Sequence, residues 1–339
     1  MPTGASRAKT IEFHGFLNRE IKIPRFVLYL FEPLLFPLAL FGILTKEKYD
    51  IVHVQGHLLM FFLFIPTLKL KKAICWTLHD VHLGPSRAGL LGKLEIWYIR
   101  AWVQPSLLRT YADAIIVHGS LQKDQLCSKK VNPSKVYVIP RFDYKYLLQG
   151  ESTTDPKCSS VLKDYILVFG HIVPFKGIEV LINAAQVVWQ TSKKNVNVVI
   201  AGSGNTSHIQ KILTEEDRHH IFTRNEWIPF NEIHDLFTRS KFLVLPYIDA
   251  SQSGVLSLSY TFSKPVIVSR AGSLSEYVEH GKRFIFDINN TEQLANYIIL
   301  SLCTEIGNRA YQKACDQMSL EFCCRIVNSI YESIEPRKH

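Results

Sequence analysis

The sequence lacks the signatures of several classes of protein. Its seven cysteines are odd in number and none is spaced as C-x-x-C, which argues against a disulfide framework or a structural zinc site and favours a reducing compartment. No D-x-D triplet occurs, so that arrangement of carboxylates is not available to a metal ion. The first 16 residues lack the apolar core of a secretory signal. No zinc-finger, RNA-recognition or basic-zipper pattern indicates a nucleic-acid partner.

Acidic residues are scarce in the first half of the chain only. Residues 1–150 contain 20 lysines and arginines against 10 aspartates and glutamates, whereas residues 151–339 contain 19 against 20. The formal net charge of +9 therefore arises in the first half. This asymmetry predicts an anionic partner for that half, either a membrane surface or a pyrophosphate-bearing lipid, with nucleic acid as the disfavoured alternative.

One apolar stretch, residues 26–44, has the length of about 20 residues that spans a bilayer. It contains Glu32, Pro33 and Pro37, and a carboxylate inside a span is costly in lipid. We expect a helix that is buried in a core or lies on a membrane surface, and a true span is the least favoured of the three readings.

At 339 residues the chain is long enough for two domains. Short apolar runs alternate with helical patterns, which predicts an α/β fold with a parallel sheet in each half. The polar segment 149–163 has the composition of a linker, so we expect domains at 1–148 and 164–310 and a final helix, 311–339, that packs back toward the first domain. The expected strands are 10–16, 49–54, 73–78, 114–117, 136–139, 166–169, 196–200, 221–222, 242–245 and 265–268; the expected helices are 58–70, 88–110, 177–190, 231–239, 254–263, 291–304 and 307–336.

The segment 165–185 suggests a phosphate site. A buried strand ends at Gly170, a turn lies between Pro174 and Gly177, and a helix follows. A helix N-terminus carries unpaired N–H groups and partial positive charge, and Lys176 adds a full charge beside it. Taken alone, the segment is equally compatible with an ordinary strand-to-helix turn and a surface lysine.

Histidines follow the expected strands of the first half. His53, His79, His118 and Ser120 lie at or near strand ends. Ligands of open parallel sheets bind beyond the carboxyl ends of the strands, so these side chains are candidates for a site.

The order of these signals resembles the GT-B glycosyltransferases, in particular the retaining family 4. The resemblance covers residues 49–330 and rests on YDIVHV, TLHD, FGHIVPFKG, IAGSG, WIPFNEIHDLFTRSKFLVLPY and SQSGVLSLSYTFSKPVIVSRAGSLSEYVEHG. It implies two Rossmann-like domains that face each other across a cleft. It also implies that a sugar is transferred from a nucleotide-sugar donor with no metal or other cofactor.

The resemblance assigns roles to particular residues. It gives His79 and Lys176 catalytic roles, at the reacting sugar and at the leaving diphosphate. Ser253 at a helix start also suits an N-cap and a close approach of phosphate. The full set of donor-binding residues that it implies is Gly170, His171, Lys176 and Gly177 for the diphosphate; Trp227, Ile228 and Pro229 for the base; and Ser251, Ser253, Gly254, Val255 and Glu276.

The sequence departs from the family pattern in three places. His171 stands where arginine is usual. The two glutamates that commonly lie eight positions apart are replaced by Ala250 and Leu258, or, one position later, by Ser251 and Ser259. No apolar first strand with a glycine-rich loop precedes residue 10, so the first domain is expected to be shortened at its start.

The sequence therefore predicts a retaining, metal-independent glycosyltransferase. The acceptor would be a saccharide or a polyprenyl- or other lipid-linked saccharide in the synthesis of cell-surface polysaccharide or glycolipid. The enzyme would be cytoplasmic and peripheral at the inner face of an anionic membrane, with no nucleic-acid partner. The alternatives are a non-catalytic GT-B relative that acts as a binding or partner subunit, and another GT-B activity such as nucleotide-sugar epimerisation.

Overall fold

The computed structural model describes residues 50–55, 72–79, 104–145, 162–192, 194, 196–278, 284–303, 316 and 318–334. The expected strand 10–16, the apolar stretch 26–44, the helix 58–70 and most of the segments 88–110 and 149–163 lie outside these residues. Within the described part, no helix is both long and apolar enough to cross a membrane.

The first half forms a four-stranded parallel sheet in the order β1-β2-β3-β4. Every residue of β2 and β3 is buried, as expected for parallel strands that are covered on both faces. The strands are β1 (Ile51–Gln55), β2 (Ala73–Thr77), β3 (Ala114–Val117) and β4 (Val136–Val138).

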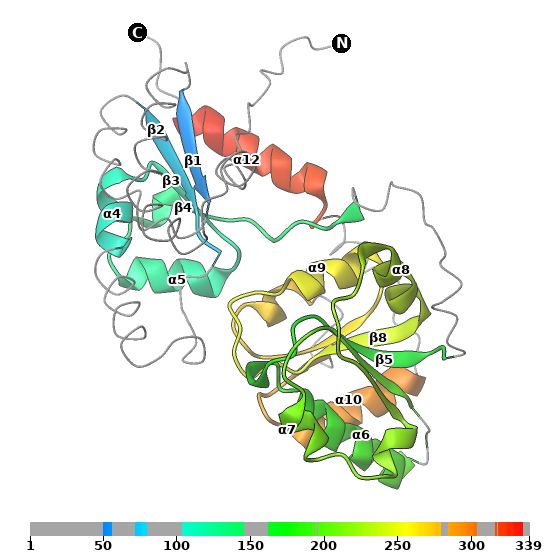
Figure 1. Ribbon diagram of the computed structural model, residues 1–339. Coiled ribbons are helices and arrows are strands. Elements are labelled where there is room, and N and C mark those ends of the chain that lie inside the picture. Colours follow the sequence, from blue (N-terminus) through cyan, green and yellow to red (C-terminus); the bar gives the residue numbers. More distant parts are fainter. Residues whose placement is uncertain are drawn as a thin grey trace, which may run out of the picture.

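Helices cover both faces of this sheet (Figure 1). On one face, α4 (Gln104–Tyr111) and α5 (Ser120–Ser128) contribute Leu108 and Leu126 to a core around Trp76. On the other face, α12 (Leu320–Ile334) packs its residues Cys323 and Ile330 against β2 and β3. The last helix of the described chain therefore belongs to the core of the first sheet.

The second half forms a six-stranded parallel sheet in the order β10-β9-β8-β5-β6-β7. The chain moves outward from β5 in one direction through β6 and β7 and then returns to the other side of β5 with β8. The pair β5–β8 is thus a switch point, where ligands of such sheets bind. The strands are β5 (Tyr165–Phe169), β6 (Val198–Ala201), β7 (Ile221–Arg224), β8 (Ser240–Leu245), β9 (Val266–Ser269) and β10 (Ile285–Phe286).

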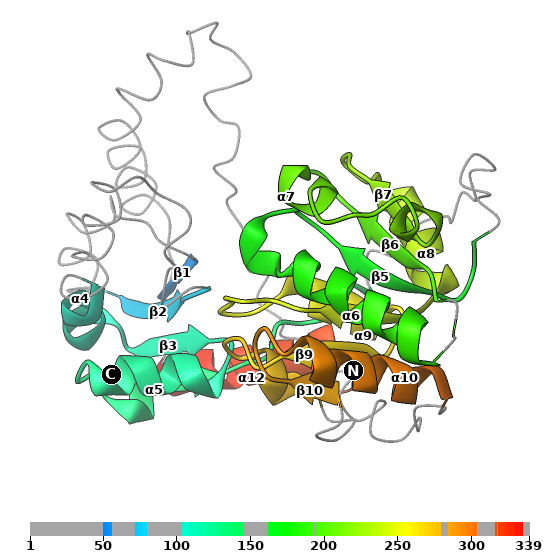
Figure 2. The same cartoon turned by 90° about the horizontal axis from the view of Figure 1, so that it is seen from below.

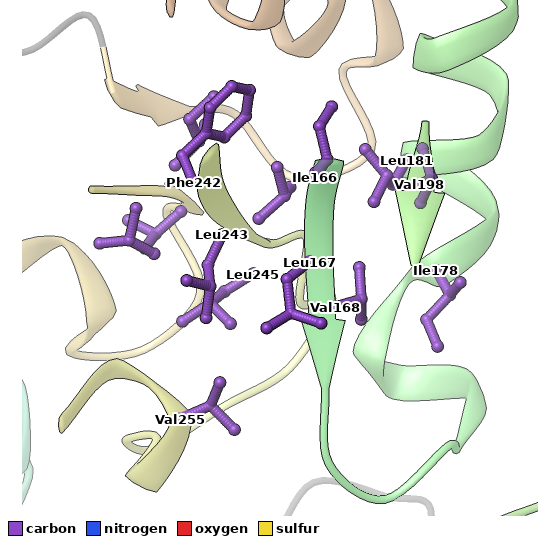
Figure 3. Close-up of a cluster of buried hydrophobic side chains, with 14 of the residues drawn as sticks. Ile166, Leu167, Val168, Ile178, Leu181, Val198, Phe242, Leu243, Leu245 and Val255 are labelled. Carbon is purple, nitrogen blue, oxygen red and sulfur yellow. The ribbon is translucent and has the colours of Figure 1, made fainter. Parts of the chain in front are cut away.

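Two helical layers enclose the second sheet (Figures 1 and 2). α6 (Ile178–Ser192) and α10 (Thr291–Cys303) pack together on one face, and α8 (Phe230–Arg239) and α9 (Gly254–Thr261) lie on the other. A short helix, α7 (Ser207–Gln210), follows β6. Figure 3 shows how Ile166, Leu167 and Val168 of β5 meet the side chains of β8 and α6 in the core.

The expected α/β fold with two parallel sheets is confirmed. The strand 114–117 has the predicted bounds, and the other strands that lie in the described part deviate by a few residues. α5 was not expected, because SLQKDQLCS carries only two large apolar residues, and neither was the two-residue strand β10. Pro105 is the second residue of α4, where proline costs no intrahelical hydrogen bond.

Leu243 tests the packing of the second sheet because it is fully buried on the central strand β8. Replacing Leu243 with alanine should lower the free energy of unfolding by about 3 kcal/mol, since the lost methyl groups leave a cavity. Urea denaturation followed by circular dichroism measures this change. The control Ile288→Ala removes a side chain that is 41% exposed and should cost about 0.5 kcal/mol or less. Equal losses in the two variants would contradict the assigned core.

Candidate functional site

The candidate site lies at the carboxyl edge of the second sheet. All six strands are parallel, so the segments that follow them meet at one edge. These segments carry Gly170 to Gly177 after β5, Trp227 after β7, Tyr247 to Ser253 after β8 and Glu276 after β9. The donor-binding residues that the sequence predicts lie in these segments, except Gly254 and Val255, which begin the helix α9 (Gly254–Thr261) directly after them.

The loop after β5 is shaped by two glycines. Gly170, with φ of 105°, ends the strand, and a 3₁₀ turn, η6 (Pro174–Lys176), is closed by Gly177 with φ of 61°. A Cβ atom on Gly177 would lie 2.0 Å from the carbonyl oxygen of Pro246. Only glycine fits this position, and its close approach places Lys176 beside the segment that follows β8.

Lys176 is held by a buried tyrosine. Its Nζ donates to the Tyr247 hydroxyl at 2.5 Å and lies 3.9 Å from the centre of the Tyr247 ring. The same hydroxyl lies 3.1 Å from Ser253 Oγ, and Tyr247 is only 2% exposed. Tyr247 therefore connects the ammonium group to the serine at the start of α9.

Ser253 is the N-cap of α9, as the sequence predicts. Its side-chain oxygen accepts from the backbone N–H of Val255 at 3.2 Å. A Cβ atom on Gly170 would lie 3.4 Å from a methyl group of Val255, so the loop after β5 runs beside the first turn of this helix. The Lys176 ammonium group and the N-terminus of α9 are thus linked through Tyr247. This arrangement is suited to an anion.

In the first domain, His79 and His118 form a stacked pair beyond β2 and β3. Their ring centroids are 5.1 Å apart, and His79 Nδ1 lies 3.0 Å from His118 Nε2. His118 Nδ1 lies 3.0 Å from the Ile139 carbonyl oxygen, which can only accept, so this nitrogen carries a proton. In the neutral pair His118 Nε2 then accepts from His79 Nδ1–H, and the lone pair of His79 is on Nε2.

His53 is a partly buried residue that links β1 to its neighbours in the first domain. It is the third residue of β1 and bonds Thr77 Oγ1 at 2.7 Å and the Tyr331 hydroxyl of α12. Burial, with a smaller effect from His79, lowers the pKa of His53 to about 4, so it is neutral at pH 7. These bonds give His53 a structural part.

Gln252 joins the histidine pair to the second domain. Its Nε2 donates to the His79 carbonyl oxygen at 3.1 Å, and this oxygen also accepts from Gln122 Nε2 at 3.0 Å. Gln252 directly precedes the N-cap Ser253. The two residues for which a catalytic part is expected, His79 and Lys176, therefore flank the same short segment.

Glu276 links the two domains through both oxygens of its carboxylate group. Its oxygens accept from the backbone N–H groups of Ser120 at 2.6 Å and Leu121 at 3.1 Å, the first two residues of α5. These amides have no partner inside the helix, and Gly119 supplies no side-chain cap. A Cβ atom on Gly119 would lie 2.1 Å from Ser273 Oγ, so glycine permits the contact. Figure 2 shows α5 beside the segments that follow β9.

Tyr277 adds a second bond across the domains. Its hydroxyl donates to the His118 carbonyl oxygen at 2.6 Å. Burial, reinforced by the Glu276 carboxylate, raises the pKa of Tyr277 well above its usual range, so the phenol keeps its proton. The two domains thus share hydrogen bonds at the histidine pair and at α5.

The remaining predicted residues lie on the same edge of the sheet. His171 is exposed in the loop after β5, and Ser251 lies two residues before the N-cap. Trp227 is 82% exposed, whereas Ile228 is buried and Pro229 precedes the first residue of α8. Of the positions where the family carries glutamate, Ser259 is fully buried and donates to the Leu256 carbonyl, outside the site.

Sequence reasoning missed Tyr247 and Gln252. Tyr247 directly follows Leu245-Pro246 at the end of β8, a position that a parallel sheet brings to its ligand-binding edge. That position was the available signal, but nothing in the sequence indicates that the tyrosine reaches Lys176. Within the described residues, no group of three or more His, Cys, Asp or Glu side chains could hold a metal ion.

Two family models match the chain in succession. The model described as "Glycosyltransferase Family 4" matches residues 5–142, and the model "Glycosyl transferases group 1" matches residues 159–317. A comparison with curated proteins finds no match.

Solved glycosyltransferase structures share the fold. HepE of Anabaena in complex with UDP is 16% identical with a TM-score of 0.65, over 88% of this chain and 82% of that one. Sucrose-phosphate synthase from Thermosynechococcus elongatus is 16% identical with a TM-score of 0.65, over 92% and 80%. A trehalose-phosphate synthase from Burkholderia xenovorans in complex with glucose-6-phosphate is 11% identical with a TM-score of 0.67, over 93% and 80%. With its two family matches in order and its two parallel-sheet domains, the chain belongs to the GT-B glycosyltransferases.

Proposed function

We propose that this glycosyltransferase moves a sugar from a nucleoside diphosphate sugar, and specifically a UDP-sugar, to a hydroxyl group of a saccharide or lipid-linked saccharide. One observation carries the proposal. Gln252 donates to the carbonyl of His79 while its neighbour Ser253 caps α9 and is linked through Tyr247 to Lys176. This chain of contacts supports a single site that contains both the first-domain histidine and the second-domain anion site. The choice of UDP is supported by the similar HepE structures with UDP and with UDP-glucose.

In this proposal the leaving diphosphate is stabilised at the start of α9. Negative charge grows on the diphosphate as the bond from the anomeric carbon to oxygen breaks, so fixed positive groups lower the barrier. The Lys176 ammonium supplies a full charge, and the first N–H groups of α9 supply a partial one. Tyr247 positions the ammonium, which costs less reorganisation than a free lysine side chain would.

The other residues divide between sugar, base and domain closure. His79 contacts the sugar, with its ring fixed by His118. Gly170, His171 and Gly177 form the diphosphate loop. Ser253, Gly254 and Val255 form the start of the helix that binds the distal phosphate, and Ser251 lies two residues before the N-cap. Trp227 supplies an exposed aromatic face for the base, beside the backbone of Ile228 and Pro229. Glu276 closes the second domain onto α5.

We further propose that the anomeric configuration is retained and that no metal takes part. The acceptor hydroxyl attacks on the side of the leaving group, and the diphosphate charge is balanced by the groups named above. The basic first half of the chain suits an acceptor at an anionic membrane, so the enzyme acts as a peripheral protein on the cytoplasmic face, in the synthesis of polysaccharide or glycolipid.

Lys176→Met tests the diphosphate site, because methionine keeps the apolar stem and removes the charge. UDP should raise the melting temperature of the wild type and should have little effect on the variant, since a ligand that binds the native state stabilises it by an amount that grows with the ligand concentration relative to the Kd. kcat/KM with the best UDP-sugar should fall by about 100-fold or more. The same melting-temperature measurement should be made with GDP- and ADP-sugars. A rise in the melting temperature with only one of these would replace UDP by that nucleotide in the proposal.

Lys241→Met is the matched control for this experiment. Lys241 lies near the amino end of β8, at the opposite edge of the sheet, and is exposed. The melting temperature of the Lys241→Met variant should rise with UDP as that of the wild type does. Unchanged UDP stabilisation in Lys176→Met, or no response of the wild type to any nucleotide sugar, would contradict the proposed function.

Tyr247→Phe tests the positioning of the ammonium. Loss of the phenol oxygen removes a bond to the charged Lys176, so we expect UDP to bind about 10-fold more weakly. Tyr165→Phe is the control, because Tyr165 is equally buried in the same domain and its hydroxyl donates to the Leu236 carbonyl away from the site. Isothermal titration calorimetry with UDP compares the two. The same loss in both variants would show a general effect on the fold and not on the site.

The proposed stereochemistry and metal independence are tested on the product. With an α-linked donor, proton NMR of the purified product should show an α linkage, and a chelator should leave the initial rate unchanged. A β linkage, or a rate that EDTA abolishes and Mg²⁺ or Mn²⁺ restores, would contradict this part of the proposal.

A further inference from the structure

A first-domain segment runs along one face of α9. Ser257 Oγ donates to the Arg141 carbonyl oxygen at 3.2 Å, and the Tyr144 N–H donates to Thr261 Oγ1 at 2.9 Å. Ser257 and Thr261 are one helical turn apart, and Gly254 precedes Ser257 by three residues on the same face. These contacts fix the segment that follows β4 along this face of α9.

The guanidinium of Arg141 lies at the start of α9. A Cβ atom on Gly254, the first residue of the helix, would lie 3.7 Å from Arg141 Cζ and 3.8 Å from Nε. Side chains of a helix point back toward its N-terminus. The guanidinium therefore lies beside the first residue of α9.

This guanidinium has no hydrogen-bond or ion-pair partner among the residues that the structure describes, although Arg141 is partly buried. An arginine that is removed from water is normally paired with a carboxylate or another anion. The missing partner points to an anionic ligand.

A cavity beside Arg141 is lined by two residues that each have a buried polar atom without a hydrogen-bond partner. Ser273 is 1% exposed and its Oγ has no hydrogen-bond partner, and neither has the buried Oε1 of Gln252. The Gln252 amide cannot be reversed, because only its NH₂ group can donate to the His79 carbonyl. The cavity lies between the domains and is lined by these residues with Arg141, His118, Ser253 and Tyr277. Buried polar groups are normally paired, so each of these atoms indicates a place for a polar partner.

We propose that Arg141 binds the diphosphate of the donor and that the first domain thereby supplies a positive charge to the leaving group. The inference rests on the proposed function and adds a residue to its site. A guanidinium can donate two parallel bonds to one phosphate, which an ammonium cannot. With Lys176 in the second domain and Arg141 in the first, the diphosphate would be held by both domains at once.

The test compares Arg141→Gln with the wild type by calorimetry, using UDP, UMP and inorganic pyrophosphate. Arg141→Gln should weaken the binding of UDP and of pyrophosphate by about 10- to 100-fold. The binding of UMP should be nearly unchanged, because the proposed contact is to the distal phosphate at α9, which UMP lacks. Arg218→Gln is the matched control; Arg218 is in the 3₁₀ turn before β7, at the opposite edge of the sheet, and should bind all three as the wild type does.

A measurement on the wild type guards against misfolding of the variant. UDP should protect Arg141 from phenylglyoxal, as mapped by mass spectrometry, and should leave the labelling of Arg218 unchanged. If Arg141→Gln binds UDP as the wild type does while Lys176→Met does not, or if Arg141 is labelled equally with and without UDP, the inference is overturned and the proposed function stands. If the wild type binds neither UDP nor pyrophosphate, both fall.

Discussion

The contact between Lys176 and Tyr247 is the interaction on which the site depends. It joins the loop after β5 to the segment after β8, the two strands between which the sheet reverses its direction of growth. The buried Tyr247 hydroxyl also contacts Ser253 Oγ, so the lysine and the N-terminus of α9 have fixed relative positions. Gly177 makes this possible, because any side chain there would collide with the Pro246 carbonyl. A preorganised positive site of this kind is what a departing diphosphate requires.

The second constraint is that the domains meet at the site itself. Glu276 caps α5, Tyr277 bonds the carbonyl of His118, and Gln252 bonds the carbonyl of His79. Each bond links a residue beyond a strand of one sheet to a residue beyond a strand of the other. A change in the relative position of the domains would therefore move His79 with respect to α9, which couples domain closure to the geometry of the proposed sugar site.

Strand positions could be predicted from the sequence because buried parallel strands are short runs of apolar, often β-branched residues, as at Ala114–Val117. Ser253 could be predicted as a cap because a cap depends on local sequence. Tyr247 could not be assigned, since its partner Lys176 is 71 residues away and only tertiary structure brings the two together. The sequence also gave no indication that the Glu276 oxygens would reach α5, because this contact depends on how two separately folded sheets are packed.

The central claim is that Lys176, the start of α9 and His79 surround one donor molecule. A crystal structure of the protein with a bound UDP-sugar tests this most directly. We predict that the distal phosphate lies within hydrogen-bonding distance of Lys176 Nζ and of the first backbone N–H groups of α9, with the sugar ring next to His79. A donor bound elsewhere, or a diphosphate that contacts neither Lys176 nor α9, would contradict it.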